Sequence, residues 1–184
     1  LNNFSPENII EVKEMPNLEK YLLGSISKLN TELKSLVNDH DYHEIYVKLL
    51  NFCTLDLSAF YFDIRKDTLY CDHITSNKRK SVATCLHIVF EFLTKWLSPV
   101  ISFTAEEAWL SRNYNNTESI LMQTIKDKDF DFSNEHLNET FIELKRVRRC
   151  ITAALELKRN EKVIGSSLQA NIKLYISKQS QDLL

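Results

Sequence analysis

The chain has 184 residues, 43% of them hydrophobic and 26% charged, which is enough for one well-packed core. Only two Gly and three Pro are present, too few for the many turns of a sheet-rich fold, so the composition predicts long helices joined by few loops. The net charge is −2, but acidic and basic residues are concentrated in different segments. Residues 101–142 carry three bases and eight acids, whereas residues 143–184 carry nine bases and four acids. Such segregation permits a basic face on a mildly acidic protein.

The start of the chain, its hydropathy and its cysteines indicate the setting of the protein. The first residue is Leu1 and no basic-then-apolar signal segment follows it, so we expect a piece of a longer, cytoplasmic protein. No uncharged run exceeds 10 residues, well below the ~20 needed to cross a bilayer, and we expect no membrane association. The cysteines are widely spaced without a CxxC pair, which predicts free thiols and no metal site: Cys53, Cys71, Cys85 and Cys150.

Two helices are predicted in the N-terminal part of the chain. Leucine and isoleucine recur every three or four positions from about residue 17 to 39, directly after Pro16. A second helix should begin at Asp41, whose carboxylate can cap it, and run to about Ile64. At about 100° per residue its apolar positions form two neighbouring stripes over more than half of its circumference, which predicts a central helix packed on two sides. The stripes are Leu49, Cys53, Leu57, Phe60 and Ile64, and Phe52, Leu55, Ala59 and Phe62.

The remaining positions of this second helix allow two predictions. Asp56 and Asp63 fall within the apolar arc, either as paired catalytic carboxylates or as buried charges held by other helices, and we favour the structural role. Tyr61 and Arg65 should lie on the exposed polar stripe, together with Asn51, Thr54 and Ser58.

Two further helices are expected in the middle of the chain. Residues 77–97 carry a helical apolar stripe ending at Pro99. The stretch "SFTAEEAWL" then starts a short helix, with Thr104 and Glu107 spaced as a reciprocal capping box.

The C-terminal part should combine a long helix with a strand. Residues 113–133 form a polar connection with one apolar piece, "SILM", and residues 135–160 a helix after which Gly165 breaks the pattern. Ile172, Leu174 and Ile176 then alternate with polar residues as in a strand. We therefore predict an all-α helical bundle over residues 1–162 and, over residues 163–184, the start of an α/β junction element with a short β element.

Basic clusters carry the functional signal, because no phosphate loop, nucleophile elbow or HExxH motif is present and no catalytic residue is expected. Lys78, Arg79 and Lys80 open a helix, where the helix dipole disfavours positive charge. The last helix carries bases along its length, among them Arg146, Arg149 and Arg159. A nucleic-acid backbone, an acidic protein partner, or a solvated face with intrahelical pairs such as Glu156 with Arg159 would each account for them.

Three stretches resemble the anticodon-binding domain of bacterial-type isoleucyl-tRNA synthetases. They are "NFCTLDLSAFYFDIRKDTLYCD" (51–72), "LTKWLSPVISFTAEEAW" (93–109) and "LELKRNEKVIGSSLQA" (155–170). The resemblance implies a helical bundle that follows a class I catalytic domain and grips the anticodon stem and loop of the isoleucine tRNA. It also implies that ATP and zinc serve the full-length enzyme, expected as a monomer, and that this chain holds no cofactor because the His-Ile-Gly-His and Lys-Met-Ser-Lys-Ser signatures are absent.

The expected RNA contacts follow from the basic clusters and the polar stripe. Basic heads would hold phosphates, and planar side chains would stack on unpaired bases. The candidates are Tyr61, Arg65, Lys78, Arg79, Lys80, Arg146, Arg149 and Arg159. The sequence departs from the family at Ser25, where relatives carry an arginine, and the family's first helix with its Arg-Asn start would precede Leu1.

Overall fold

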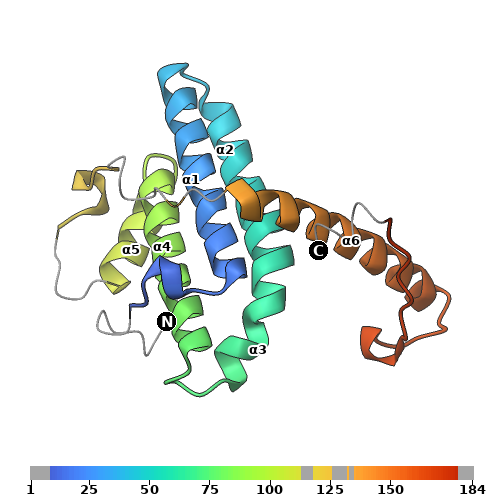
Figure 1. The fold of residues 1–184 in the computed structure, drawn as a ribbon. Coiled ribbons are helices and arrows are strands. Elements are labelled where there is room, and N and C mark those ends of the chain that lie inside the picture. Colours follow the sequence, from blue (N-terminus) through green and yellow to red (C-terminus); the bar gives the residue numbers. More distant parts are fainter. Residues whose placement is uncertain (1–8, 113–117, 126–131, 133–134, 178–184) are drawn as a thin grey trace. The chain divides into compact units, whose positions relative to one another are not determined.

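The computed structural model describes residues 9–112, 118–125, 132 and 135–177 (Figure 1). The chain divides into two compact units, Leu1–Ser133 and Asn134–Leu184. The regular elements of the described residues are all helical, which confirms the predicted all-α class. The predicted division after residue 162 stays a prediction.

The first unit is a bundle in which α1, the α2–α3 helix and α4 lie side by side, and α5 packs on α4 (Figure 1). Its elements are η2 (Val12–Glu14), α1 (Asn17–Asn38), α2 (Tyr42–Asn51), η3 (Phe52–Phe62), α3 (Asp63–Cys71), α4 (Asn77–Leu97), α5 (Ser102–Arg112) and η4 (Ile120–Met122).

The turn between α1 and α2 has the expected cap and an additional stop signal. His40 adopts a left-handed conformation (φ 59°), and the backbone N–H groups of His40 and Asp41 donate to the carbonyls of Val37 and Leu36. This is the Schellman pattern that closes a helix. The carboxylate of Asp41 then accepts from the backbone N–H of Glu44 at 3.1 Å, as predicted.

The helix from Tyr42 to Cys71 is continuous, and its middle third, η3, is a π-helix. From η3 onward, one row of buried residues follows intervals of five, four, four and three, with buried Phe60 beside it: Phe52, Leu57, Tyr61, Arg65 and Thr68. An α-helix repeats about every 3.6 residues, so a step of five would turn a side chain about 140° away from its predecessor. The i→i+5 hydrogen bonding of a π-helix brings such positions back to one face.

This π-helix overturns part of the predicted face assignment. Tyr61 is completely buried (0% exposed) and Arg65 is 9% exposed, so their predicted exposure is wrong. Phe62 and Ile64, predicted as buried, are exposed (40% and 39%), and so is Leu55. The physical reason is that the prediction applied the α-helical 100° step across η3. Phe60, Phe52 and Leu57 are buried as predicted.

The stretch Tyr42–Cys71 is also the one described helix that is long and apolar enough to cross a membrane, by length and composition alone. A core helix of a globular protein passes the same test. This helix contacts both of its neighbours, because the ring of Phe60 lies 6.5 Å from that of Tyr21 in α1 and the ring of Phe52 lies 6.0 Å from that of Phe92 in α4.

The α5 region differs from the predicted capping box. Helix α5 begins at Ser102, so Thr104 lies inside the helix and is not its N-cap. Glu106 instead accepts hydrogen bonds from Ser119 Oγ at 3.0 Å and the Ile120 backbone N–H at 2.8 Å. It therefore holds η4, the predicted apolar "SILM" piece, whose Ile120 is buried with Trp109.

The second unit consists of α6 (Glu135–Asn160) and the short η6 (Ser167–Gln169). Helix α6 ends where predicted, but Lys162 (φ 56°) provides the left-handed residue of a Schellman closure in place of Gly165. Gly165 donates its N–H to Gln169 Oε1 at 2.7 Å, next to a capping box formed by Ser166 and Gln169. Residues 170–177 have no regular secondary structure in the described part of this unit.

Candidate nucleic-acid interface

A buried ion pair joins α1 to the start of α3. Arg65 donates from Nε to Glu19 Oε1 at 2.6 Å and from Nη2 to Glu19 Oε2 at 2.9 Å, and Tyr61 donates its hydroxyl to Glu19 Oε1 at 3.2 Å. A planar guanidinium fork on a carboxylate is the geometry that best offsets the loss of hydration. Tyr61 and Arg65 are therefore core residues held by Glu19, and neither side chain is exposed as an RNA contact would require.

The thiol of Cys85 completes this cluster from α4. Burial raises the pKa of Cys85 to about 12, although the hydrogen bond to Tyr61 acts in the opposite direction. Burial, together with the negative charge of Glu19, also raises the pKa of Tyr61 well above its usual range. Burial lowers the pKa of Arg65, but its hydrogen bond and charge interaction with Glu19 outweigh this and leave the pKa raised. The cluster thus combines one ion pair with two neutral groups at neutral pH.

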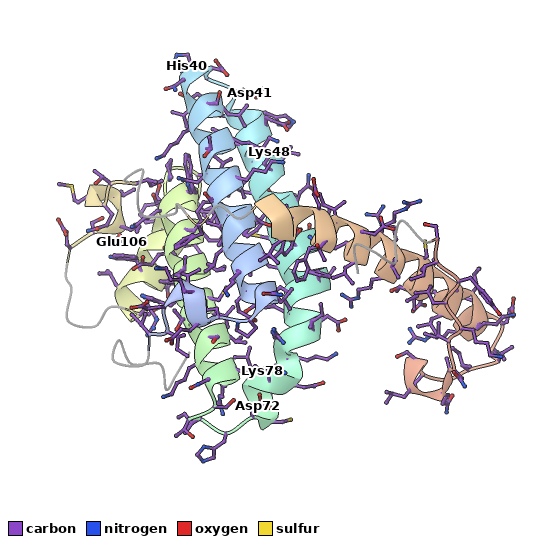
Figure 2. All side chains as sticks on the ribbon, in the orientation of Figure 1. His40, Asp41, Lys48, Asp72, Lys78 and Glu106 are labelled. Atoms are coloured by element: carbon purple, nitrogen blue, oxygen red, sulfur yellow. The ribbon has the colours of Figure 1, made fainter. Side chains whose placement is uncertain are left out.

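The structure brings the first basic cluster together at the end of the bundle formed by the α3–α4 turn. Lys78, Arg79 and Lys80 occupy the first turn of α4, where the N-cap residue Ser76 makes no side-chain cap. Arg79 donates from Nη1 to the carbonyl oxygen of Asp72, the C-cap of α3, at 2.7 Å. Asp72 and Lys78 lie at this one end of the bundle in Figure 2.

The three bases of this cluster differ in availability. Lys78 is exposed and Lys80 half-buried, and in the described part of the chain neither side chain has an ion pair or hydrogen bond. Arg79 is half-buried and committed to the turn. The two lysines are therefore available to a partner, whereas the guanidinium of Arg79 is committed to the turn.

The second basic cluster lies on α6, in the other unit. Arg146 is largely exposed (77%), with Nη1 3.5 Å from Glu143 Oε2, and Arg159 donates to Glu156 at 2.7 Å, as the sequence suggested. Arg149 is exposed. Exposed pairs of this kind contribute about 0.2–1 kcal/mol, so a phosphate can replace the carboxylate at little cost.

The structure places Asp56 and Asp63 in different surroundings. Asp63 is exposed, and its Oδ1 lies 3.0 Å from Lys66 Nζ, so its predicted place inside the buried arc is wrong. Asp56 is half-buried. Among the described residues no group of three or more His, Cys, Asp and Glu side chains could hold a metal ion, and all four cysteines are free thiols.

Sequence reasoning missed one exposed aromatic beside the first basic cluster. Tyr70, in the last turn of α3, is 85% exposed. The sequence carried a signal for this residue, because Tyr70 stands two residues before the loop that leads to Lys78. Helical periodicity alone gives the face of a residue and not its closeness to a loop.

Comparison with known proteins defines the class of this bundle. Residues 19–174 match the family of anticodon-binding domains of tRNA ligases. The chain belongs to that family, as its sequence resemblance indicated.

The curated relatives are more specific. The chain is 43% identical over 169 residues to the isoleucine–tRNA ligase of Pelagibacter ubique, covering 92% of this chain and 19% of the relative. It is 37% identical over 179 residues to that of Gluconobacter oxydans (97% and 18%) and 42% identical over 163 residues to that of Bartonella henselae (89% and 17%). The chain therefore spans less than a fifth of the length of these relatives.

Proposed function

We propose that this chain is the anticodon stem-loop-binding domain of an isoleucine–tRNA ligase, an enzyme that attaches isoleucine to its tRNA with ATP. The observation that carries the proposal is the family match over residues 19–174 together with 37–43% identity to isoleucine–tRNA ligases. The chain itself contributes recognition and no bond-making step. The catalytic domain of the same longer protein would perform the chemistry.

Binding would rest on charge neutralisation of the tRNA backbone. The proposed phosphate contacts are Lys78 and Lys80 in the first unit and Arg146, Arg149 and Arg159 in the second. Each phosphate neutralised by a base releases condensed counterions, so affinity should fall steeply with salt. Phosphate contacts fix position, and base contacts supply sequence discrimination.

The remaining features of the longer protein are part of the same proposal. We expect a cytoplasmic monomer whose ATP and zinc bind outside the described residues, which offer no set of three metal ligands. Ile172, Leu174 and Ile176 are proposed to form a strand that pairs within the longer protein, because their alternation with polar residues is that of a half-buried strand.

A filter-binding titration with isoleucine tRNA and a non-cognate tRNA at two salt concentrations tests the proposal. We expect tighter binding of the isoleucine tRNA and weaker binding of both at the higher salt. Binding that is salt-dependent but indifferent to tRNA identity would favour the rival function, a helical module whose basic helix docks an acidic protein. No binding to either tRNA would contradict the proposal for this chain.

A further inference from the structure

Tyr70 is the most exposed aromatic residue of its helix. Along the continuous helix Tyr42–Cys71, Phe52, Phe60 and Tyr61 are buried, and the other Phe and Tyr residues are 40–62% exposed, whereas Tyr70 is 85% exposed at the last turn. An exposed tyrosine presents a large flat ring with few side-chain torsions to restrict, which suits stacking on a planar partner.

The turn after Tyr70 is ordered by a set of local hydrogen bonds. The backbone N–H of Ser76 donates to the carbonyl of His73 at 2.9 Å, and that of Thr75 donates to His73 Nδ1 at 3.3 Å. Arg79 Nη1 lies 2.7 Å from the Asp72 carbonyl oxygen. These contacts fix the end of α3, and with it Tyr70, beside the first turn of α4.

Charge is distributed unequally over the two sides of this turn. The α3 side carries the exposed acids Asp63 and Asp67, of which Asp63 is paired with Lys66. The α4 side carries Lys78 and Lys80, whose side chains have no acidic partner among the described residues. A phosphate is therefore attracted to the two lysines at the start of α4.

We infer that the α3–α4 turn is a nucleotide subsite in which Tyr70 stacks on an unpaired base of the bound RNA and Lys78 and Lys80 hold the adjoining phosphates. This inference rests on the proposed tRNA-binding function and adds a base contact to it. Every base has a π-face, so any unpaired base can stack on the ring of Tyr70. The contact therefore does not require a particular base. Arg79 positions the subsite and does not contact the RNA.

The test measures binding of this chain to an RNA hairpin with the isoleucine anticodon loop, and to a blunt RNA duplex of the same length. The variants are Tyr70→Ala, Tyr70→Phe and Lys78→Ala, with Tyr42→Ala as the matched control because Tyr42 is an exposed tyrosine (62%) in the first turn of α2, beside the α1–α2 turn. Far-UV circular dichroism checks that each variant is folded.

We expect Tyr70→Ala to weaken hairpin binding by about 10-fold without changing the salt slope, since stacking releases no counterions. Tyr70→Phe and Tyr42→Ala should stay within about 2-fold of the unaltered chain, and duplex binding should not respond to Tyr70→Ala. Lys78→Ala should reduce the salt slope by about one.

Two results separate the inference from the function on which it rests. Unchanged hairpin binding by Tyr70→Ala, or an equal loss for hairpin and duplex, overturns the nucleotide subsite and leaves the tRNA-binding proposal standing. Failure of the unaltered chain to bind the hairpin at either salt concentration overturns both.

Discussion

Arg65 grips the carboxylate of Glu19 through two hydrogen bonds, at 2.6 and 2.9 Å, across 46 residues of sequence. Glu19 is completely buried. Removing the guanidinium by Arg65→Met leaves that carboxylate without its counter-charge, and we expect the free energy of unfolding to fall by about 3–5 kcal/mol. Urea unfolding followed by far-UV circular dichroism measures the loss.

The matched control for this change is Lys66→Met, which removes the exposed ion pair with Asp63 and should cost less than about 1 kcal/mol. The double variant Glu19→Met with Arg65→Met should recover much of the stability, because no buried charge remains. An Arg65→Met variant as stable as the unaltered chain would show that the pair is not maintained in solution.

The same cluster predicts loss of stability at alkaline pH. Burial raises the pKa of Cys85 to about 12 and that of Tyr61 beyond its usual range, so both groups stay protonated in the folded chain after their unfolded counterparts ionise. Below about pH 8 both states are protonated and the contribution is constant. As the pH rises above about 9, the free energy of unfolding should fall by up to about 1.4 kcal/mol per pH unit because of Cys85, and Tyr61 should add a similar slope only above about pH 10, where an unfolded tyrosine ionises.

Urea unfolding midpoints between pH 7 and 11 measure this slope. Cys85→Ala and Tyr61→Phe should each remove one group's share of it. Cys71→Ala is the control, because Cys71 is exposed and should leave the alkaline slope unaltered. Parallel curves for Cys85→Ala and the unaltered chain would contradict the proposed burial of the thiol.

The sequence predicted the helices whose apolar repeat is α-helical and whose ends carry local signals. Helix α4 spans Asn77–Leu97, and Asp41 caps α2, as the pattern indicated. The face of the α2–α3 helix could not be predicted, because no local residue preference marks the change to i→i+5 bonding in η3. The i→i+5 hydrogen bonding of η3 turns Tyr61 and Arg65 toward the core.

Pairs of residues that are far apart in the sequence could not be predicted for a related reason. Glu19 lies in the apolar stripe of α1, between Leu18 and Leu22. Its partner Arg65 falls on the exposed face of the second helix when an α-helical angle of about 100° per residue is applied. The Trp96 indole N–H donates to Asn30 Oδ1 at 2.9 Å across 66 residues. Pairs so far apart depend on how helices cross, which periodicity along one helix does not contain. The basic clusters could be predicted because the charge of a Lys or Arg side chain follows from the residue type and does not depend on how the helices pack.

Glu106 should be more important for stability than its neighbour Glu107. Its carboxylate accepts from Ser119 Oγ and the Ile120 backbone N–H, and these bonds hold Ile120 against Trp109 in a small apolar cluster. Glu106→Ala should lower the free energy of unfolding by about 1–3 kcal/mol, because the backbone N–H loses an ionised acceptor. Exposed Glu107→Ala should stay within about 0.5 kcal/mol.

Amide hydrogen exchange at Ile120 distinguishes this local effect from a global one. Exchange should accelerate in Glu106→Ala and not in Glu107→Ala. Equal exchange rates in the two variants would mean that Trp109 alone, whose indole N–H donates to the Glu118 carbonyl at 3.2 Å, fixes η4.

Lys78 and Arg79 adjoin each other but should respond differently to removal of their charge. Lys78 is exposed and has no partner among the described residues, so Lys78→Gln should weaken tRNA binding, lower the salt slope by about one and leave stability unchanged. Arg79→Gln removes the hydrogen bond to the Asp72 carbonyl, so it should also lower the free energy of unfolding by about 1 kcal/mol. Binding titrations at several salt concentrations, paired with urea unfolding of the same samples, measure both effects. A stability loss in Lys78→Gln equal to that in Arg79→Gln would contradict the division between an RNA-contacting lysine and a positioning arginine.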